Sequence, residues 1–497
     1  MGRTLTLPIR IDADGGHTLQ QQLFASIRSS IVAGRFGAEG RLPSTRALAA
    51  ELGISRTTVL LAFDQLHAEG YIVARPGSGN YIARPLPEAL PEPLFDPKRA
   101  ARSRASASLK HPGLSARGRA LAEAPTPDRR RSGPPRAFRL GTPAVDLFPF
   151  ALWSQLARQC LRSVSRSRLD YSPLAGLSEL REAIAEQMAA RGTSCELEQV
   201  FIVAGAQRGL DLLFHLLLDP GDVAYLEEPG YPGAYTALLS AGARALGVPV
   251  DREGLAIERA PSGGRLAYVT PSHQFPLGVA MSLSRRQKLL AWASRHGAWV
   301  VEDDYDAGFR YDARPLPCLH ALDPDGRVIY VGTFSKTLFP SLRIGFLILP
   351  TDLVDAFCRA RLASDVHPPL LEQAVLAAFM LRGHYQRHLR RMQTAYTERL
   401  DTLQSALLQS GIPLHLRPVH SGLHAVADLA AGEAEPIAAA AAEQHLEVMP
   451  LGAYYQATRA RPEALVLGFG AVRPAVIRSG VARLARVIDE RRRGAPG

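Results

Sequence analysis

One lysine of this chain stands where a reactive amine would be useful. Only four of the 58 Lys and Arg residues are lysines, and Lys336 alone among them follows closely on an apolar strand-like run, Val328–Val331. Arginine supplies positive charge equally well but stays protonated, whereas a partly buried lysine amine can form a Schiff base with an aldehyde. The position of Lys336 therefore indicates carbonyl chemistry.

A second apolar run, Trp299–Glu302, leads into a loop rich in carboxylates. Ligands of open α/β sheets bind just beyond the carboxyl ends of the strands, so Asp303 and Tyr305 are expected near Lys336. A pyridoxal phosphate site requires a lysine for the aldehyde, a carboxylate that keeps the pyridine nitrogen protonated, and donors for the phosphate. Asp303 can supply the carboxylate, and Tyr305 can hydrogen-bond the phenolate oxygen.

Donors for a phosphate dianion occur in two further segments. Two of them flank Lys336, and three stand where the run Val200–Val203 gives way to a helical pattern. A helix N-terminus with small residues exposes N–H groups and the positive end of its dipole, which suits a phosphate. The candidate phosphate donors are Thr333, Arg343, Gly205, Ala206 and Gln207.

Six segments follow one another in the order typical of one protein family. They are Tyr171–Arg181, Val203–Gly209, Glu228–Pro232, Thr270–Gly278, Glu302–Tyr305 and Val331–Phe346. From about residue 140 onward the chain resembles the fold-type I aminotransferases, and the whole chain resembles a MocR/GabR-type member of the GntR regulators. The resemblance implies an α/β pyridoxal-phosphate-dependent transferase domain and a homodimer, in which Tyr171 reaches the phosphate bound by the partner subunit.

The resemblance also places three side chains near the cofactor ring. Tyr231 is expected on or beside the pyridine ring, and His273 or Gln274 near its ring oxygen. The segment departs from the family's Pro-Thr-Gly at Pro276–Gly278, so the residue that contacts this oxygen stays open. Asp304 and Asp306 are interpreted as solvated or structural.

Residues 1–83 carry the pattern of a winged helix-turn-helix. Apolar residues recur every four positions from Leu19 to Ile31, and Ser44 and Ser55 are the predicted N-caps of two shorter helices. A short hairpin that begins at Tyr71 follows as the wing. This part resembles the GntR winged helix, which implies binding to double-stranded promoter DNA.

The first turn of the third predicted helix is the part of a recognition helix that reaches base edges. The second helix and the wing are expected to meet the phosphate backbone. The predicted DNA-contacting residues are Ser44, Thr45, Arg46, Ser55, Arg56, Thr57, Thr58, Arg75, Gly77 and Gly79. Val59, Leu60, Phe63 and Leu66 are expected to face the core instead.

The net charge of +11 is concentrated in one segment. Residues 98–139 hold twelve Lys and Arg against two Asp and Glu and are rich in Ala, Ser, Gly and Pro. Residues 84–139 are therefore predicted to be a flexible basic linker, which is either a solvated spacer or an attractor of DNA phosphates. In residues 140–383, apolar runs alternate with helical patterns, which predicts a mostly parallel sheet covered by helices. Residues 384–497 are predicted to be a small α+β lobe.

The remaining composition narrows the class of protein. The four cysteines have no ligand-like spacing, so reduced thiols and no metal site are expected. The N-terminus lacks an apolar signal core, and no apolar run approaches the ~20 residues that span a bilayer. These features favour a cytoplasmic protein without a membrane partner.

Two functions use the same cofactor chemistry. One is a transcription regulator that senses a small amine, an amino acid or the cofactor itself, and the other is a working aminotransferase with an accessory DNA-binding domain. The run Ala464–Phe469 lies where amino-acid aminotransferases present the arginine for the substrate carboxylate, and it has none. Arg459, Arg461 and Arg473 flank it and are candidates for that role. The sequence favours the regulator and is compatible with weak turnover.

Overall fold

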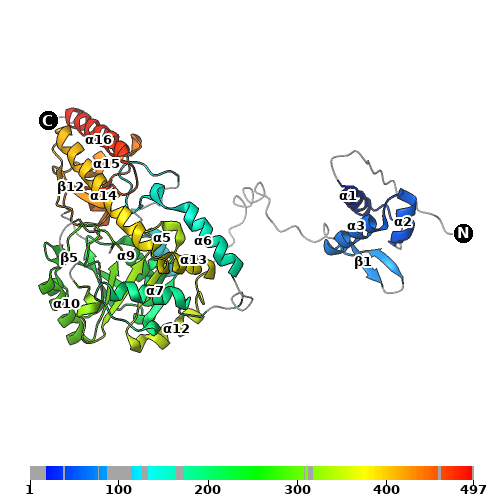
Figure 1. Cartoon of the computed structure of the whole chain (residues 1–497), viewed down its shortest axis with the longest axis horizontal. Helices are drawn as coiled ribbons and strands as arrows, with labels where there is room; N and C mark the ends of the chain where they lie inside the picture. Colours follow the sequence, from blue (N-terminus) through cyan, green and yellow to red (C-terminus); the bar gives the residue numbers. More distant parts are fainter. Residues whose placement is uncertain are drawn as a thin grey trace. The chain divides into compact units, whose positions relative to one another are not determined.

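A computed structural model describes residues 18–36, 40–75, 78–86, 113–124, 133–163, 170, 173–306, 308–311, 317–456 and 461–494. The chain divides into two compact units, Met1–Pro112 and Gly113–Gly497 (Figure 1). Among the described helices, none combines the length and the apolar character needed to cross a membrane.

The N-terminal unit contains three helices and a two-stranded hairpin, as predicted. They are α1 (Leu19–Val32), α2 (Thr45–Leu52), α3 (Arg56–Ala68), β1 (Ile72–Arg75) and β2 (Gly79–Ile82). The Ser44 side chain accepts a hydrogen bond from the Ala47 backbone N–H, and the Ser55 side chain accepts one from Thr58. Both predicted N-caps are therefore confirmed. Gly53 ends α2 in the left-handed conformation, which permits the tight turn into α3.

The core of this unit lies between α1 and α3. Val59, Phe63 and Leu66 are buried against α1 residues, but Leu60 is 40% exposed, so the prediction that Leu60 faces the core is wrong. Positions 59, 63 and 66 share one helix face, whereas the next residue after 59 is rotated by about 100° toward solvent. His67 Nε2 lies 2.9 Å from Asn80 Oδ1 and joins α3 to the wing.

The C-terminal unit is built on an eight-stranded sheet with the order β3-β10-β9-β8-β7-β4-β5-β6. Its strands are β3 (Val200–Val203), β4 (Val223–Glu228), β5 (Arg244–Asp251), β6 (Gly254–Leu255), β7 (Gly264–Val269), β8 (Trp299–Asp304), β9 (Val328–Thr333) and β10 (Gly345–Ile348). Strands β5, β4, β7, β8 and β9 pair in parallel, while β10 is antiparallel to both β9 and β3. The predicted mostly parallel sheet is confirmed.

Helices cover both faces of this sheet. They are α6 (Phe150–Ser163), α7 (Ser178–Ala189), α8 (Ala206–Leu217), α9 (Pro232–Ala241), α10 (Leu283–His296), α11 (Leu319–Leu322), α12 (Val354–Leu362) and α13 (Leu370–Leu381). Alternate residues of a strand serve opposite faces. In β3, Phe201 and Val203 pack with α8, whereas Val200 and Ile202 pack with α7 and α13.

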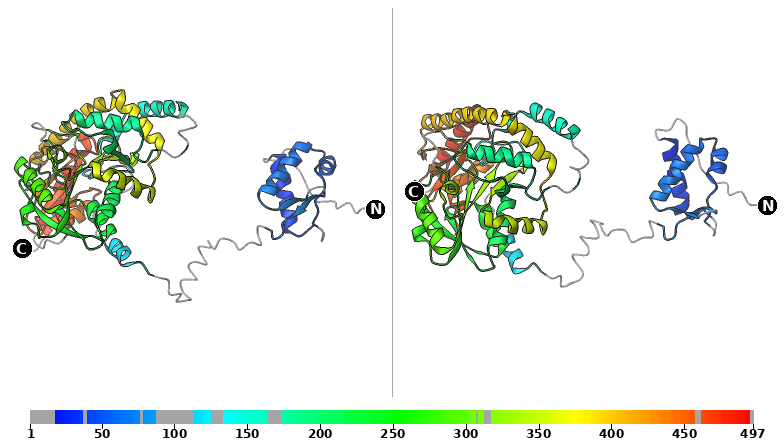
Figure 2. Two further views of the ribbon diagram at one scale, coloured as in Figure 1. Left: turned by 90° about the horizontal axis from the view of Figure 1, so that it is seen from below. Right: turned by 60° about the horizontal axis from the view of Figure 1, so that its bottom comes forward.

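A smaller C-terminal lobe follows. Its antiparallel sheet has the order β11-β12-β14-β13. The elements are α14 (His384–Ser410), β11 (His415–Leu416), β12 (His424–Asp428), α15 (Ala434–Glu443), β13 (Met449–Pro450), β14 (Ala464–Gly468) and α16 (Pro474–Gly494). Helices α14 and α16 pack side by side (Figures 1 and 2). The predicted α+β lobe is confirmed.

The second part of the predicted flexible linker, residues 84–139, is folded. Helix α5 (Ala116–Glu123) packs on α9, and Phe138 is buried in the small lobe, where its carbonyl accepts a hydrogen bond from the Gly468 N–H. The prediction is therefore wrong from Gly113 for the residues that the structure describes. The composition of this segment favoured a linker because the segment is mostly basic and polar, but the buried Phe138 ring anchors it to the small lobe. Residues 87–112 lie outside the described residues.

The contrast between Phe63 and Leu60 can be tested by unfolding. Phe63→Ala should destabilise the N-terminal unit by about 3–5 kcal/mol, because it removes a fully buried ring. Leu60→Ala, the matched control on the same helix, should change the free energy of unfolding by less than about 1 kcal/mol. Urea denaturation of residues 1–86 followed by circular dichroism measures both. Equal losses would contradict the assigned core face.

Candidate functional site

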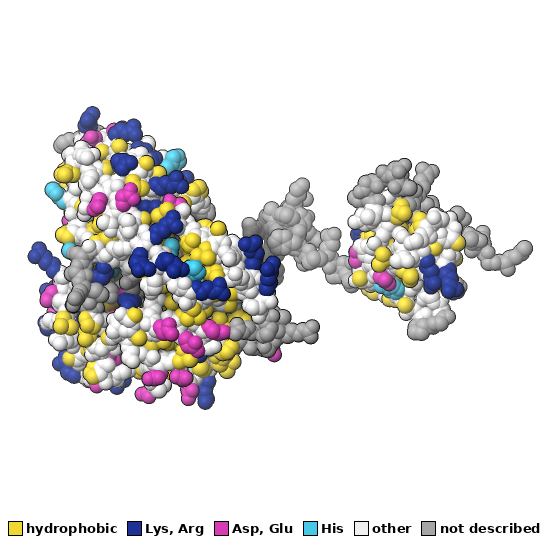
Figure 3. All heavy atoms as spheres, viewed as in Figure 1, with side chains coloured by type: hydrophobic (Ala, Val, Ile, Leu, Met, Phe, Trp, Pro, Cys, Tyr) yellow, Lys and Arg dark blue, Asp and Glu magenta, His cyan; other side chains and the backbone are white. Residues whose placement is uncertain are grey.

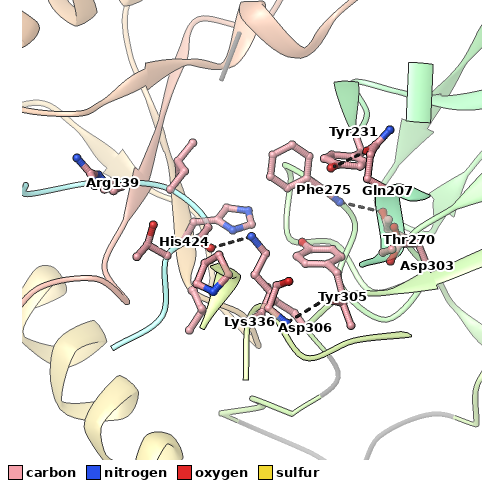
Figure 4. Close-up of a pocket in the computed structure, with 18 of the residues that line it drawn as sticks. Arg139, Gln207, Tyr231, Thr270, Phe275, Asp303, Tyr305, Asp306, Lys336 and His424 are labelled. Atoms are coloured by element: carbon pink, nitrogen blue, oxygen red, sulfur yellow. Dashed lines mark hydrogen bonds between the residues drawn. The ribbon is translucent and has the colours of Figure 1, made fainter. Parts of the chain in front are cut away.

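A cavity of about 500 Å³ lies beside the carboxyl ends of the central strands. This volume is within the ~300–1,000 Å³ range of small-molecule sites. Its walls come from the start of α8, from the segments after β4, β7, β8 and β9, from the chain just before α6, and from the small lobe (Figure 4). Residues distant in sequence thus meet at the edge where the sheet topology predicts a ligand.

Asp303 presents an incompletely satisfied carboxylate to this cavity. Its Oδ2 accepts a hydrogen bond of 2.7 Å from the Tyr268 hydroxyl, while its buried Oδ1 has no partner among the described residues. Burial raises the pKa of Asp303 to about 7. A cationic N–H donor at Oδ1 would complete the hydrogen bonding and stabilise the ionised form. The protonated pyridine nitrogen of pyridoxal phosphate fits this requirement.

Lys336 enters the same cavity from the loop after β9. Its Nζ donates a 2.7 Å hydrogen bond to the carbonyl of Gly141. A Cβ atom at Gly141, whose φ is +66°, would lie only 2.6 Å from this nitrogen. Because residue 141 is a glycine, the Lys336 amine can reach across the cavity to the backbone around Gly141, the segment against which the small lobe packs.

An anion cradle surrounds the N-terminus of α8. Gly205 precedes the helix with φ +87°, and a Cβ there would lie 2.9 Å from the guanidinium carbon of Arg343. Arg343 itself has φ +53° and donates a 3.0 Å hydrogen bond to the Ala204 carbonyl. A non-glycine residue in the left-handed region indicates a conformation imposed by its surroundings. The helix N-terminus and Arg343 can together bind a phosphate.

Tyr305 closes the cavity on the side of β8. Its hydroxyl lies 3.0 Å from His273 Nδ1, which in turn lies 3.1 Å from Asp306 Oδ2. Burial and the nearby Asp306 hold the pKa of Tyr305 well above its usual value, so the phenol stays protonated and can donate. Burial also lowers the pKa of the neighbouring His424 to about 4, which leaves that ring neutral near pH 7.

Two carboxylates that were interpreted as solvated or structural are structural. Asp304 is buried and binds Arg191 and the Tyr330 hydroxyl, each at 2.7 Å. Asp306 is buried beside His273. Neither is solvated.

Most of the predicted cofactor residues meet in this cavity. The predicted residues that line it are Lys336, Asp303, Tyr305, Arg343, Thr333, Ala206, Gln207 and Tyr231. Gly205 shapes the cradle, and His273 lies behind Tyr305. Gln274 contacts buried Glu227 and backbone carbonyls instead. Tyr171 lies outside the described residues.

The flanking arginines do not line this cavity in the described part of the chain. Arg473 is exposed and pairs with Asp146, and Arg461 donates to the Gly452 carbonyl. Arg459 lies outside the described residues. Several other lining residues were not predicted from the sequence, among them Tyr268, Ser335, Arg139 and Glu447. Of these, Tyr268 was predictable, because it occupies an inward position of a strand next to β8.

The winged helix presents the predicted DNA residues in two ways. Arg46, Arg56 and Thr57 are exposed, and Figure 3 shows basic side chains gathered on part of this unit. The side chains of Ser44, Ser55 and Thr58 are engaged in helix caps. Thr45 is half-exposed at the start of α2.

In the wing, the Arg75 guanidinium lies 4.4 Å from the centre of the Tyr81 ring. Gly79 has φ +108° and approaches the Arg41 side chain. Sequence reasoning did not name Arg41. Gly77 lies outside the described residues.

Fold and site together define a winged-helix regulator with an aminotransferase-type pyridoxal phosphate domain. Residues 139–466 match the class I and II aminotransferases, and residues 19–82 match the gntR family of bacterial regulatory proteins. Pyridoxal phosphate is the cofactor of this domain. The chain belongs to the MocR-type branch of the GntR regulators.

Full-length relatives share both units. The chain is 40% identical to the "Probable rhizopine catabolism regulatory protein MocR" of Rhizobium meliloti, covering 95% of this chain and 94% of that one. It is 32% identical to the pyridoxine biosynthesis regulator PdxR of Corynebacterium glutamicum, covering 93% and 94%. Among solved structures, α-aminoadipate aminotransferase LysN of Thermus thermophilus, complexed with N-(5'-phosphopyridoxyl)-L-leucine, matches with a TM-score of 0.65 and 28% identity, over 78% of this chain and 98% of LysN.

Because one Asp303 oxygen has no partner, replacing this residue should have opposite effects on the stability of the cofactor-free protein and on cofactor retention. In the cofactor-free protein, the raised pKa means that folded Asp303 keeps a proton that the unfolded chain loses between about pH 4 and pH 7. Its contribution to stability therefore declines as pH rises through that window. Asp303→Asn should remove this decline and stabilise the cofactor-free protein at pH 7.5 by on the order of 1–3 kcal/mol, yet weaken cofactor retention.

Urea unfolding at pH 5 and pH 7.5, together with cofactor absorbance after dialysis, measures both effects. Asp304→Asn is the matched control, because it breaks the ion pair with Arg191 and should destabilise the protein at both pH values. Unchanged cofactor retention in Asp303→Asn would contradict the assignment of the ring-nitrogen partner.

Proposed function

We propose that this DNA-binding transcription regulator senses a small amine, an amino acid or the cofactor level through its pyridoxal phosphate pocket. Bound pyridoxal phosphate supplies an aldehyde that condenses reversibly with primary amines. The observation that carries the proposal is the meeting of Lys336 with the incompletely paired Asp303 in one cavity. The gntR-type unit in the same chain gives that pocket a DNA-binding output.

Each pocket residue has a proposed task toward the cofactor. Lys336 would hold it covalently through its amine, which an effector amine would replace. Asp303 would keep the pyridine nitrogen protonated, and Tyr305 would donate to the phenolate oxygen. The phosphate would be bound by Arg343, Thr333, Gly205, Ala206 and Gln207. Tyr231 lies beside the ring, and His273 orients Tyr305.

Assembly and location are part of the proposal. The chain acts as a homodimer in the cytoplasm, with Tyr171 reaching the phosphate site of the partner subunit. The winged helix contacts promoter DNA, with Arg56, Thr57 and Thr58 at base edges. Ser44, Thr45, Arg46 and Ser55 contact the backbone from the helices, and Arg75, Gly77 and Gly79 contact it from the wing.

A dedicated aminotransferase needs a cation that fixes the substrate carboxylate. Strand β14 carries no arginine, and neither Arg461 nor Arg473 lines the cavity. This supports regulation as the main function. Weak turnover remains compatible with the pocket.

Replacing the lysine separates a sensor from an enzyme. Lys336→Ala should keep basal binding to an operator fragment, because the winged helix has its own hydrophobic core, but it should lose the effector-dependent change in DNA affinity. Fluorescence anisotropy with and without pyridoxal phosphate and candidate amines measures this. An intact ligand response in the variant would refute the proposed sensing, and brisk transamination by the wild type without any DNA response would favour the enzyme.

Arg56 and Arg46 give a matched pair for DNA recognition. Arg56→Ala should weaken binding to an operator fragment by about 1–3 kcal/mol and affect scrambled DNA much less, because a base-edge contact is lost. Arg46→Ala should weaken both DNAs alike and reduce the salt dependence. Titrations at two salt concentrations distinguish these results. Equal losses for Arg56→Ala on both DNAs would make it a phosphate contact.

A further inference from the structure

Three side chains meet at one ring nitrogen beside the cavity. The Tyr305 hydroxyl and the Asp306 Oδ2 atom lie 3.0 and 3.1 Å from the same atom, Nδ1 of His273. His273 and Asp306 are only 4% and 5% exposed. A ring nitrogen of a neutral histidine carries either a proton or a lone pair, so it either donates or accepts. The position of this one proton therefore decides whether Tyr305 can donate to His273.

Asp306 needs a donor at its Oδ2 atom. Its buried Oδ1 atom has no hydrogen-bond partner among the described residues, and His273 Nδ1 is the partner of Oδ2. An ionised carboxylate can only accept, and a buried one that loses its donor is strongly destabilised. Asp306 therefore favours the tautomer of His273 that carries the proton on Nδ1.

No other titratable group near Asp306 replaces this donor. These groups are Asp303, Tyr305, Tyr311, Tyr396 and His424. None of them is hydrogen-bonded to Asp306 in the part of the chain that the structure describes. The Tyr311 hydroxyl and His424 Nε2 donate to backbone carbonyls instead. The tautomer of His273 is thus the main way to satisfy the Asp306 carboxylate.

The small lobe confines the His273–Asp306 pair. Gly422 has φ +83°, and a Cβ atom there would lie 2.5 Å from His273 Nδ1 and 2.7 Å from Asp306 Oδ2. The Gly422 N–H donates to the Phe309 carbonyl at 3.0 Å, which fixes this glycine against the loop after β8. The His424 ring packs against the His273 ring, with centroids 5.0 Å apart. This packing holds Nδ1 of His273 toward Asp306.

The tautomer determines where the Tyr305 proton can go. With a proton on Nδ1, His273 has no lone pair there, so the Tyr305 oxygen can only accept from this N–H. Tyr305 lines the cavity and keeps its own proton, which is then free to point toward the phenolate oxygen of a bound cofactor (Figure 4). In the opposite tautomer Tyr305 would donate to His273 and would have no proton left for the cofactor.

We propose that Asp306 is a positioning residue that, by keeping the proton on His273 Nδ1, directs the Tyr305 hydroxyl toward the phenolate oxygen of the cofactor. This inference rests on the proposed donation from Tyr305 and adds the residue that determines its direction. A buried carboxylate that holds a histidine in one tautomer plays the same part in serine proteases.

Nitrogen NMR of the cofactor-free full chain tests the tautomer directly. In protein with isotope-labelled histidine, the His273 signals are identified by their loss in His273→Gln, and they should show a protonated Nδ1. In Asp306→Asn the amide can donate to Nδ1, so the proton should move to Nε2. A proton on Nε2 in the wild type would overturn the inference, and that measurement does not depend on the folding of the Asp306 variant.

The pH at which the bound cofactor changes its visible absorbance tests the consequence. Tyr305→Phe removes a donor to the phenolate oxygen and should raise this pH midpoint by about one to two units. Asp306→Asn should raise it as well, because Tyr305 then donates to His273. The mere loss of the Asp306 charge would lower the midpoint, since a nearby anion favours the protonated form. In the Tyr305→Phe background, Asp306→Asn should give no further rise.

Asp304→Asn is the matched control. It removes a buried carboxylate that pairs with Arg191 rather than with His273, so it should not raise the midpoint. An unchanged or lower midpoint in Asp306→Asn, or a further rise in the Tyr305→Phe background, would overturn the inference. An unchanged midpoint in Tyr305→Phe would instead refute the proposed donation from Tyr305. If the midpoints shift as expected while amines leave DNA affinity unchanged, amine sensing fails and the role of Asp306 stands.

Discussion

The site depends on a buried carboxylate that the protein alone does not fully satisfy. Asp303 stands at the carboxyl end of β8, and the sheet order places β7 and β9 on either side of it. Strand β7 supplies the Tyr268 hydroxyl, and the loop after β9 supplies Lys336. Burial raises the pKa of Asp303 to about 7. A ligand with a protonated ring nitrogen would pair with this carboxylate in a buried site and stabilise its ionised form.

The strands that carry these groups could be predicted because their signals are local. Val200–Val203 is an apolar run with a glycine two positions later, and it coincides with β3. The predicted run Val328–Val331 is the larger part of β9, so Lys336 was correctly placed just after a strand. The N-caps Ser44 and Ser55 were predictable for the same reason, since the cap and the N–H groups that it satisfies are close in sequence.

What could not be predicted depends on partners that are distant in sequence. Arg139 and Glu447 are 308 residues apart, and the residues next to each in sequence give no indication that the two form an ion pair. Ala137 and Phe138 are buried in a segment whose composition is basic and polar, so composition favoured a linker where the chain is folded. The prediction for Leu60 was wrong in the opposite direction, because its apolar character favoured burial but its position around the helix axis exposes it.

The same distant contacts connect the pocket to the chain that leads from the DNA-binding unit. Residues 139–142 form one wall of the cavity, and they belong to the first part of the C-terminal unit, which begins at Gly113. Lys336 donates to the Gly141 carbonyl, a bond that its amine cannot keep unchanged when it holds the cofactor. Arg139 ties the same wall to the small lobe through Glu447. Occupancy of the pocket can bias the DNA-binding unit only if the ligand binds two conformations of the protein with different free energies, and these two contacts are part of the wall that a ligand would meet.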